Sequence, residues 1–246
     1  MAENKNPDSA RKALYSVAGA AALLTVLNGL AEIAVTFLPG GGMSSGPLTA
    51  VDWYSLYRSN PFMGMRNLGL LNIVFTLLSI PVSYALYTAH RRTHRAFAGL
   101  SLLVALLGVA VFLATNRAFP MLALSSRYAS AATDAQRSVL AAAGEAMLAV
   151  GQSHTAGTFL AFFLSTAGGI GISVVMLRAK LFSKASAILG IVGFSLLMIF
   201  EFTSDFAPGS PVSFAFAISG GPLSMAWDLL VGLGLFRLAG QPGATR

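Results

Sequence analysis

The sequence predicts an all-α, polytopic integral membrane protein, and three observations support this class. Hydrophobic residues make up 55% of the 246 residues and charged residues only 10%, with a mean hydropathy of +0.71. Soluble domains usually carry about 25% charged residues, so this chain has too few polar side chains to cover a water-facing globule. Long apolar stretches also alternate with short polar turns. Because backbone groups in lipid must be paired and strand-like alternation is missing, these stretches are expected to be helices.

Six of the apolar stretches are long enough to cross a membrane, which takes roughly 20 residues at about 1.5 Å each. We expect spans at residues 13–38, 67–89, 96–119, 154–177, 185–206 and 211–238. The first stretch is longer than the roughly 7–15 apolar residues of a signal peptide, so it is expected to be a retained span. The prediction is a six-helix transmembrane bundle over residues 13–238, with tails at 1–12 and 239–246.

The basic residues predict how this bundle is oriented. Eleven of the 16 Lys and Arg residues precede the first span, fill the second-to-third and fourth-to-fifth turns, or follow the last span: Lys5, Arg11, Lys12, Arg91, Arg92, Arg95, Arg178, Lys180, Lys184, Arg237 and Arg246. Basic loops favour the cytoplasmic side, so we expect a cell-membrane protein with both termini in the cytoplasm. The net charge of +7 does not indicate nucleic-acid binding, because no basic stripe with interleaved aromatic residues is present.

Two external connections are expected to contain helices. Residues 52–57 hold three aromatic side chains and predict a short helix lying in the membrane interface, where aromatic rings favour the headgroup level. Residues 133–150 predict an external amphipathic helix, because Thr133 and Gln136 have the spacing of a capping box and apolar residues then recur at helical spacing. We expect this helix to pack across the outer mouth of the bundle or to extend the fourth span outward.

Ionisable and amide side chains inside the spans are the most informative functional feature. Each intramembrane charge costs roughly 2.5–3.5 kcal/mol on insertion scales, so each needs a partner or a purpose. They gather in the outer half, whereas the inner half is apolar with small residues such as Gly168, Gly169 and Gly171 that suit close helix packing. The residues predicted to line an outward-facing polar pocket are Glu32, Arg66, Asn72, Arg117, His154, Glu201, Asp205 and Asp228.

We expect this pocket to bind or transport a small molecule or lipid. Four of its residues are expected to face one cavity: Glu32, Arg117, Glu201 and Asp228. The alternative for the same residues is ion pairing that only locks the helices together. At function level, the alternatives are a membrane-embedded enzyme acting from the outer leaflet and a structural or assembly subunit without a ligand. Apart from membrane lipids, the sequence names no partner, and it leaves the oligomeric state open.

Other chemistry has less support in the sequence. The absence of Cys excludes disulfides and thiol catalysis. A metal site is one alternative, because Glu201 and Asp205 share a helix face that His154 could approach. Catalytic zinc usually has three protein ligands, most of them His, so no metal and no cofactor is expected. No G-x-S-x-G motif supports nucleophilic catalysis. Residues 220–222 (Gly-Gly-Pro) suggest either a simple proline kink or a broken helix of the kind that transporters use.

One segment resembles a known family. Residues 122–137, Leu-Ala-Leu-Ser-Ser-Arg-Tyr-Ala-Ser-Ala-Ala-Thr-Asp-Ala-Gln-Arg, and the following residues 140–145 are similar to a stretch after the third span of bacterial six-span membrane proteins catalogued only as a domain of unknown function. The layout matches from about residue 13 to residue 238. The resemblance implies this architecture and no established activity, so it assigns no catalytic residue.

Overall fold

The computed structural model describes residues 7–38, 49–151, 154, 156–207 and 210–241. These described residues form ten helices and no strand, so the predicted all-α class is confirmed. Six of the helices are long and apolar enough to cross a membrane: α1 (Pro7–Thr36), α4 (Leu70–His90), α5 (Arg95–Thr115), α8 (Phe159–Ala179), α9 (Lys184–Phe206) and α10 (Pro211–Gly240). The six-span architecture follows from these lengths and compositions.

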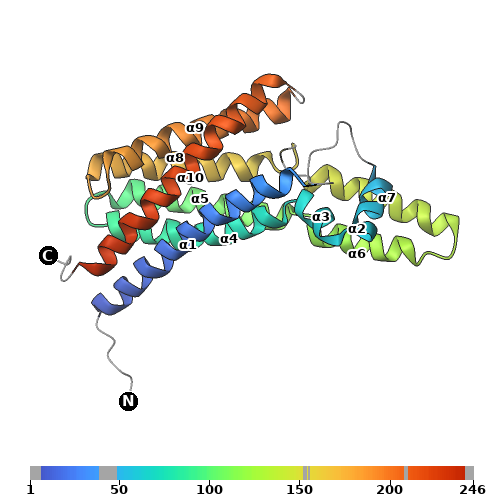
Figure 1. Cartoon of the computed structure of the whole chain (residues 1–246), viewed down its shortest axis with the longest axis horizontal. Coiled ribbons are helices and arrows are strands. Elements are labelled where there is room, and N and C mark those ends of the chain that lie inside the picture. The colour runs from blue at the N-terminus through green and yellow to red at the C-terminus, as the bar shows by residue number, and fades with distance from the viewer. Residues whose placement is uncertain (1–6, 39–48, 152–153, 155, 208–209, 242–246) are drawn as a thin grey trace, which may run out of the picture.

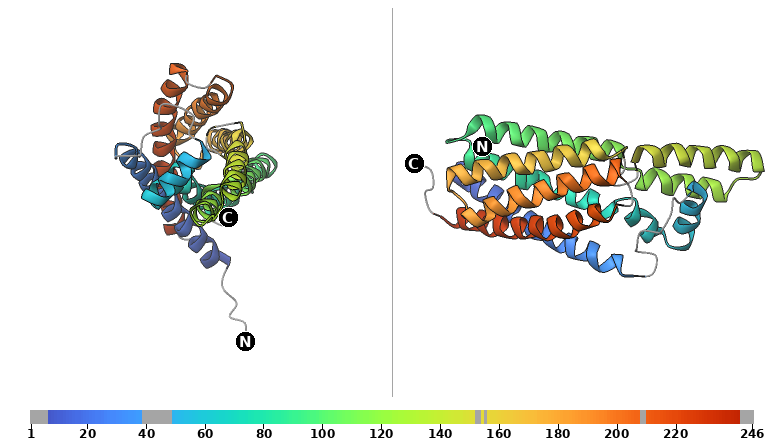
Figure 2. Two further views of the ribbon diagram at one scale, coloured as in Figure 1. Left: turned by 90° about the vertical axis from the view of Figure 1, so that its right-hand side faces the viewer. Right: turned by 90° about the horizontal axis from the view of Figure 1, so that it is seen from above.

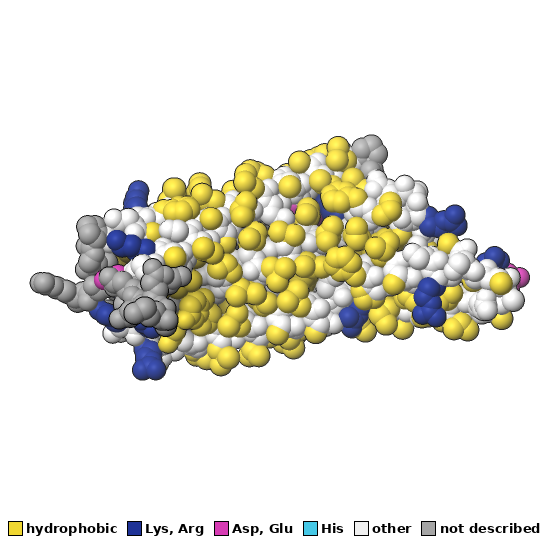
Figure 3. Space-filling model, turned by 90° about the horizontal axis from the view of Figure 1, so that it is seen from below, with side chains coloured by type: hydrophobic (Ala, Val, Ile, Leu, Met, Phe, Trp, Pro, Cys, Tyr) yellow, Lys and Arg dark blue, Asp and Glu magenta, His cyan; other side chains and the backbone are white. Residues whose placement is uncertain are grey.

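The outward sides of these helices are apolar, as lipid requires. Leu27 is 59% exposed, Phe97 63% and Leu160 52%. Figure 3 shows a broad hydrophobic band across the face in view, with Lys and Arg side chains gathered toward the two ends of the molecule. Side chains of this kind would be costly to expose to water but not to acyl chains. The protein is therefore a multi-pass membrane protein.

The six spans form a ring in which each packs against its neighbours in the sequence and α10 returns to α1 (Figures 1 and 2). Small residues set how closely the helices approach. A Cβ placed on Gly168 of α8 would lie 2.8 Å from the Cβ of Ala105 on α5, and one on Gly171 would lie 2.5 Å from the Ser101 hydroxyl. A Cβ on Gly169 would lie 2.7 Å from the Phe194 ring of α9. The predicted close packing at these three glycines is confirmed.

The apolar core of the ring lies in the half nearer the chain ends, which we call the tail end. Its buried members come from all six spans and include Tyr15, Leu86, Ala98, Met176, Phe194 and Trp227. His90, one residue beyond the predicted second span, also belongs to this region. It is fully buried as the last residue of α4, with its ring stacked on Phe182 and its Nδ1 2.8 Å from the Leu86 carbonyl oxygen.

The opposite end carries four further helices, which we call the cap: α2 (Ala50–Ser59), α3 (Pro61–Asn67), α6 (Ala118–Ala129) and α7 (Asp134–Gly151). The cap has its own core around Trp53, Tyr54 and Tyr57. Tyr54 and Tyr57 are 1% and 2% exposed, and their hydroxyls donate to the carbonyls of Leu140 and Ala118 at 2.7 and 2.8 Å. The short helix predicted at residues 52–57 is therefore present within α2, and α6 and α7 cover its aromatic rings, which pack inside the cap.

The helix predicted at 133–150 is α7. The Gln136 backbone N–H donates to the Thr133 hydroxyl, and the Gln136 side-chain oxygen accepts from the Ala132 N–H at 2.9 Å, one residue earlier than in a standard capping box. With α6 it forms a hairpin that projects away from the ring (Figures 1 and 2). It packs on α6 and α2, so it extends outward and does not lie across the bundle's mouth.

The last span is continuous. Helix α10 runs through Pro222 without interruption from Pro211 to Gly240. Gly220 packs against Leu197 of α9, because a Cβ placed on this glycine would lie 3.0 Å from the Leu197 Cγ, so the glycine serves helix contact. The broken-helix alternative for residues 220–222 is therefore wrong.

Candidate functional site

Five of the eight predicted pocket residues gather where the ring meets the cap. Glu32 comes from α1, Arg66 from α3, His154 from the α7–α8 connection, and Glu201 and Asp205 from α9. We call them the cap-end cluster. Two ion pairs hold the cluster together, and the carboxylates of Glu32 and Asp205 also act electrostatically on His154.

The first ion pair joins α1 to α3. The Arg66 guanidinium lies 2.8 Å from the Glu32 carboxylate, and its side chain is only 7% exposed against 39% for that of Glu32. It also donates to the Glu32 carbonyl at 3.0 Å, to the Asn67 side-chain oxygen at 3.0 Å and to the Thr36 hydroxyl. Hydrogen bonds assisted by charge are about twice as strong as neutral ones, so Arg66 ties the end of α1 firmly to the cap.

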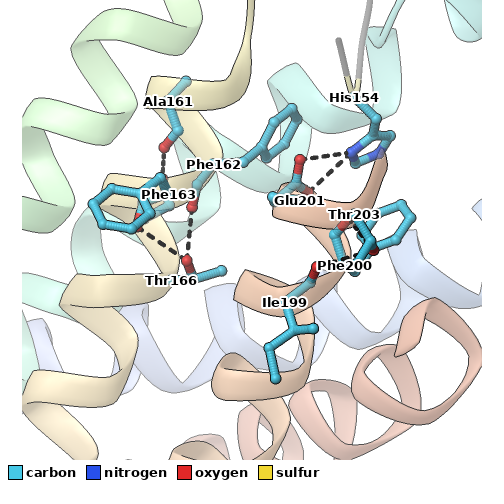
Figure 4. A network of polar contacts seen from close by, with 10 residues as sticks. His154, Ala161, Phe162, Phe163, Thr166, Ile199, Phe200, Glu201 and Thr203 are labelled. Atoms are coloured by element: carbon cyan, nitrogen blue, oxygen red, sulfur yellow. Dashed lines mark hydrogen bonds and ion pairs between the residues drawn. The ribbon is translucent and has the colours of Figure 1, made fainter. Parts of the chain in front are cut away.

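The second ion pair joins the α7–α8 connection to α9 (Figure 4). His154 Nδ1 lies 2.9 and 3.2 Å from the two carboxylate oxygens of Glu201, which is buried at 3% exposure. The imidazole stacks on Phe162 with a ring-centroid distance of 4.8 Å and meets Phe200 at 4.9 Å. His154 has a φ of 54°, a left-handed conformation uncommon for residues other than glycine, so its contacts must offset a backbone cost.

The charge state of His154 follows from these surroundings. Burial opposes a positive charge on the imidazole and lowers its pKa. The Glu201 carboxylate, through its charge and its hydrogen bond, raises the pKa, and the carboxylates of Asp205 and Glu32 add to this effect. The carboxylates prevail, so the pKa of His154 lies above its ordinary value and the protonated form is favoured.

Asp205 differs from the other acids of the cluster. It lies one turn beyond Glu201 on α9, as the sequence spacing predicted. Both of its carboxylate oxygens are buried, and neither has a hydrogen-bond partner among the described residues. The Thr203 hydroxyl is already bonded to the carbonyls of Ile199 and Phe200 in its own helix (Figure 4). The Asp205 carboxylate is thus a hydrogen-bond acceptor that no described residue satisfies.

Three of the predicted residues do not join the cluster. Arg117 folds back on α5 and donates to the Ala114 carbonyl at 2.7 Å, where a cation favours the helix C-terminus, and it forms no ion pair with a described carboxylate. Asn72 is half-buried on α4, and its side chain makes no hydrogen bond to a described group. Asp228 is 6% exposed, but it lies about 25 Å along α10 from the cap-side end at 1.5 Å per residue, near the middle of that helix.

The predicted single cavity shared by Glu32, Arg117, Glu201 and Asp228 stays a prediction. Two cavities in the described part of the protein lie elsewhere, one at the tip of the α6–α7 hairpin and one at the tail end, and none of the eight residues lines either. Within the described ranges, no group of three His, Asp or Glu side chains converges to hold a metal ion.

Sequence reasoning missed the residues that support the cluster. Thr36 lies one turn beyond Glu32 on α1, so helical spacing could have indicated its contact with Arg66. Phe162 and Phe200, which hold the His154 ring, gave no such signal, because they are two of 17 phenylalanines in a largely apolar chain.

A comparison with protein families shows which family this chain belongs to. Residues 29–234 match the family described as Domain of unknown function (DUF4386). The chain belongs to this family. The match runs from the cap-side part of α1 into α10, so it spans the ring, the cap and every residue of the cap-end cluster. No curated protein and no solved structure matches the chain.

Proposed function

We propose that this DUF4386 protein binds a small molecule or lipid at the cap-end cluster, and that the bound group carries a positive charge, as an amine does. The observation that carries the proposal is the Asp205 carboxylate, which is buried beside a second carboxylate and has no described partner. An uncompensated buried charge is unfavourable by several kcal/mol, so such a group is usually paired or used.

The charge balance of the cluster supports a cationic ligand. It contains three carboxylates but only one guanidinium and one imidazole. Arg66 is committed to Glu32, and His154 is committed to Glu201. Even with His154 protonated, one negative charge is left over, and it falls to Asp205. A bound ammonium group would complete the arrangement with charge-assisted hydrogen bonds.

The orientation that we propose makes the cluster accessible from outside the cell. The tail end holds the basic turns and both termini, which supports placing it in the cytoplasm. The cap and its cluster then face the outside. In this proposal, binding there serves transport of the ligand.

The test is thermal unfolding of the detergent-purified protein with ethanolamine, spermidine and tetraethylammonium, each beside a neutral analogue of similar size. A ligand at 100 times its Kd adds about 2.7 kcal/mol, which raises the Tm by roughly 5–11 °C for a chain of this size. We expect at least one amine to do so, and Asp205→Asn to abolish the shift. The control is Asp134→Asn on α7, which removes the same charge from a side chain that is 99% exposed. The proposal is wrong if no amine stabilises the protein, or if Asp205→Asn responds as the unmodified protein does.

A structural role is the second candidate, and the two ion pairs favour it. Glu32–Arg66 connects α1 to the cap, and His154–Glu201 connects the α7–α8 connection to α9, so both fix the position of the cap on the ring. If Glu32→Gln and Glu201→Gln lower stability while the amines never raise the Tm of the unmodified protein, the cluster serves assembly only.

A further inference from the structure

The tail end of the ring contains a cavity of about 130 Å³, on the opposite side of the membrane from the cap-end cluster. Four cations line it: Arg11 and Lys12 from α1, and Arg91 and Arg92 from the turn between α4 and α5. Figure 3 shows Lys and Arg side chains gathered around this end. Residues 80 positions apart in the sequence thus bring positive charge to one hollow.

The cations lie around the hydroxyl of a tyrosine whose ring is packed into the core. Tyr15 lines the same cavity at 6% exposure, and its hydroxyl donates no hydrogen bond to a described group. The charges of Arg11, Arg91 and Arg92 all act on that hydroxyl. Asp8 is the one acidic residue in the lining, so four positive charges face one negative charge. This excess of donors and positive charge fits a compact anion.

Part of the remaining lining is apolar, although Thr88 and Gln241 add two polar side chains. Leu181 and Leu238 border the cavity, beside the turn between α8 and α9 and the end of α10. A free anion has no need of such a wall, whereas the glycerol and first acyl carbons of a lipid would pack against it.

Topology alone does not account for the cavity. Basic residues in loops orient a membrane protein without having to converge. Lys180 and Lys184 lie on the neighbouring turn at the same end, and they do not line the cavity. The convergence of α1 with the α4–α5 turn is therefore a separate feature of the structure.

We propose that this cavity binds the phosphate group of an anionic phospholipid from the leaflet on the side of the termini. Arginine presents a planar fork that binds phosphate oxygens in pairs, and basic hollows between spans are suited to lipid headgroups. The Tyr15 hydroxyl donates to a phosphate oxygen, and Leu181 and Leu238 contact the glycerol and the upper acyl chain. This inference does not depend on what the cap-end cluster binds.

The test measures lipid retention by native mass spectrometry, with the purified full-length protein titrated with phosphatidylglycerol or with phosphatidylcholine. We expect a preference for phosphatidylglycerol. The variant Arg91→Gln/Arg92→Gln is expected to weaken it roughly 30-fold, from about 1 kcal/mol per cation and 1.4 kcal/mol per tenfold change. Both arginines are exposed at the protein surface, so the variant is expected to fold.

Lys180→Gln/Lys184→Gln is the matched control, because it removes two charges from the neighbouring turn. We expect it to change the affinity less than threefold. Equal losses in the two double variants would show diffuse surface attraction and overturn the proposal, as would the absence of any preference for phosphatidylglycerol. A parallel titration adds inorganic phosphate at millimolar concentration. If it displaces phosphatidylglycerol completely and binds the unmodified protein as tightly, the ligand is free phosphate and the lipid assignment is wrong.

Discussion

Replacing Arg66 with methionine tests whether the Glu32–Arg66 pair holds the cap on the ring. The change keeps much of the side-chain volume but removes the guanidinium, which is bonded to the Glu32 carboxylate and carbonyl and to Asn67 and Thr36. The Glu32 carboxylate then loses its only ion-pair partner among the described residues. Removing one member of a buried pair costs about 3–5 kcal/mol.

The exposure of Glu32 reduces that cost. Its side chain is 39% exposed, so water can solvate part of the carboxylate once Arg66 is gone. We therefore expect Arg66→Met to lower the free energy of unfolding by about 2–3 kcal/mol. At roughly 2–4 °C per kcal/mol for a chain of this length, the Tm falls by about 4–12 °C.

A double-mutant cycle in detergent isolates the pair from the other contacts of Arg66. The fluorescence of Trp53 in the cap and Trp227 in the ring reports unfolding of both parts. Combining Arg66→Met with Glu32→Gln should give a coupling energy of about 1–2 kcal/mol. Arg58→Met, at an exposed arginine of α2, controls for the loss of charge. Strictly additive effects, with a coupling energy below about 0.5 kcal/mol, would refute the ion pair as a clamp.

Two further predictions concern the ring. The pKa of His154 is raised in the folded protein, so protonated His154 stabilises the fold fully below its unfolded pKa of about 6.5, and this stabilisation is lost as pH rises through the folded pKa. The Tm should therefore fall between pH 6 and pH 9. The fall should be smaller in His154→Gln. An unchanged pH profile in the variant would contradict the assignment. Gly168→Ala should destabilise the protein by about 1–3 kcal/mol, because the new Cβ would lie 2.9 Å from the Ala105 backbone nitrogen. Gly221→Ala is the control in the same thermal unfolding assay. It should be neutral or slightly stabilising, because no atom lies within 4 Å of the new Cβ. Equal effects at the two glycines would argue against the tight α5–α8 contact.

Several features were predictable because they depend on residues close together in the chain. Hydropathy over about 20 residues indicates a span, and the apolar tail-end half with an ionisable cap-end half is visible in the same way. The i, i+4 relation of Glu201 and Asp205 follows from helix geometry alone. The start of α7 beside Thr133 was also predictable, because a cap involves only a few neighbouring residues.

The cap was not predictable from local pattern. Aromatic residues near a span ordinarily indicate the membrane interface, but the Tyr54 ring is buried inside the cap, where its hydroxyl bonds to the carbonyl of Leu140, 86 residues later. Only the folded chain shows that α6 and α7 bury the aromatic face of α2. The direction of α7 was undecided for the same reason, since its apolar residues suit either a lipid surface or a protein surface.

The amino-acid sequence alone determined that this chain spans a membrane six times, where its charges lie along each span, and which half of the bundle is polar. The reason is that the free energy of transferring a helix into lipid is roughly the sum of the contributions of its residues. The tertiary structure decided which charges pair: Arg66 with Glu32 across 34 residues and His154 with Glu201 across 47. It also turned Arg117 back to the end of α5 and left the Asp205 carboxylate without a described hydrogen-bond partner. A pairing depends on distances of about 3 Å between groups on different helices, and spacing along one helix carries no information about that.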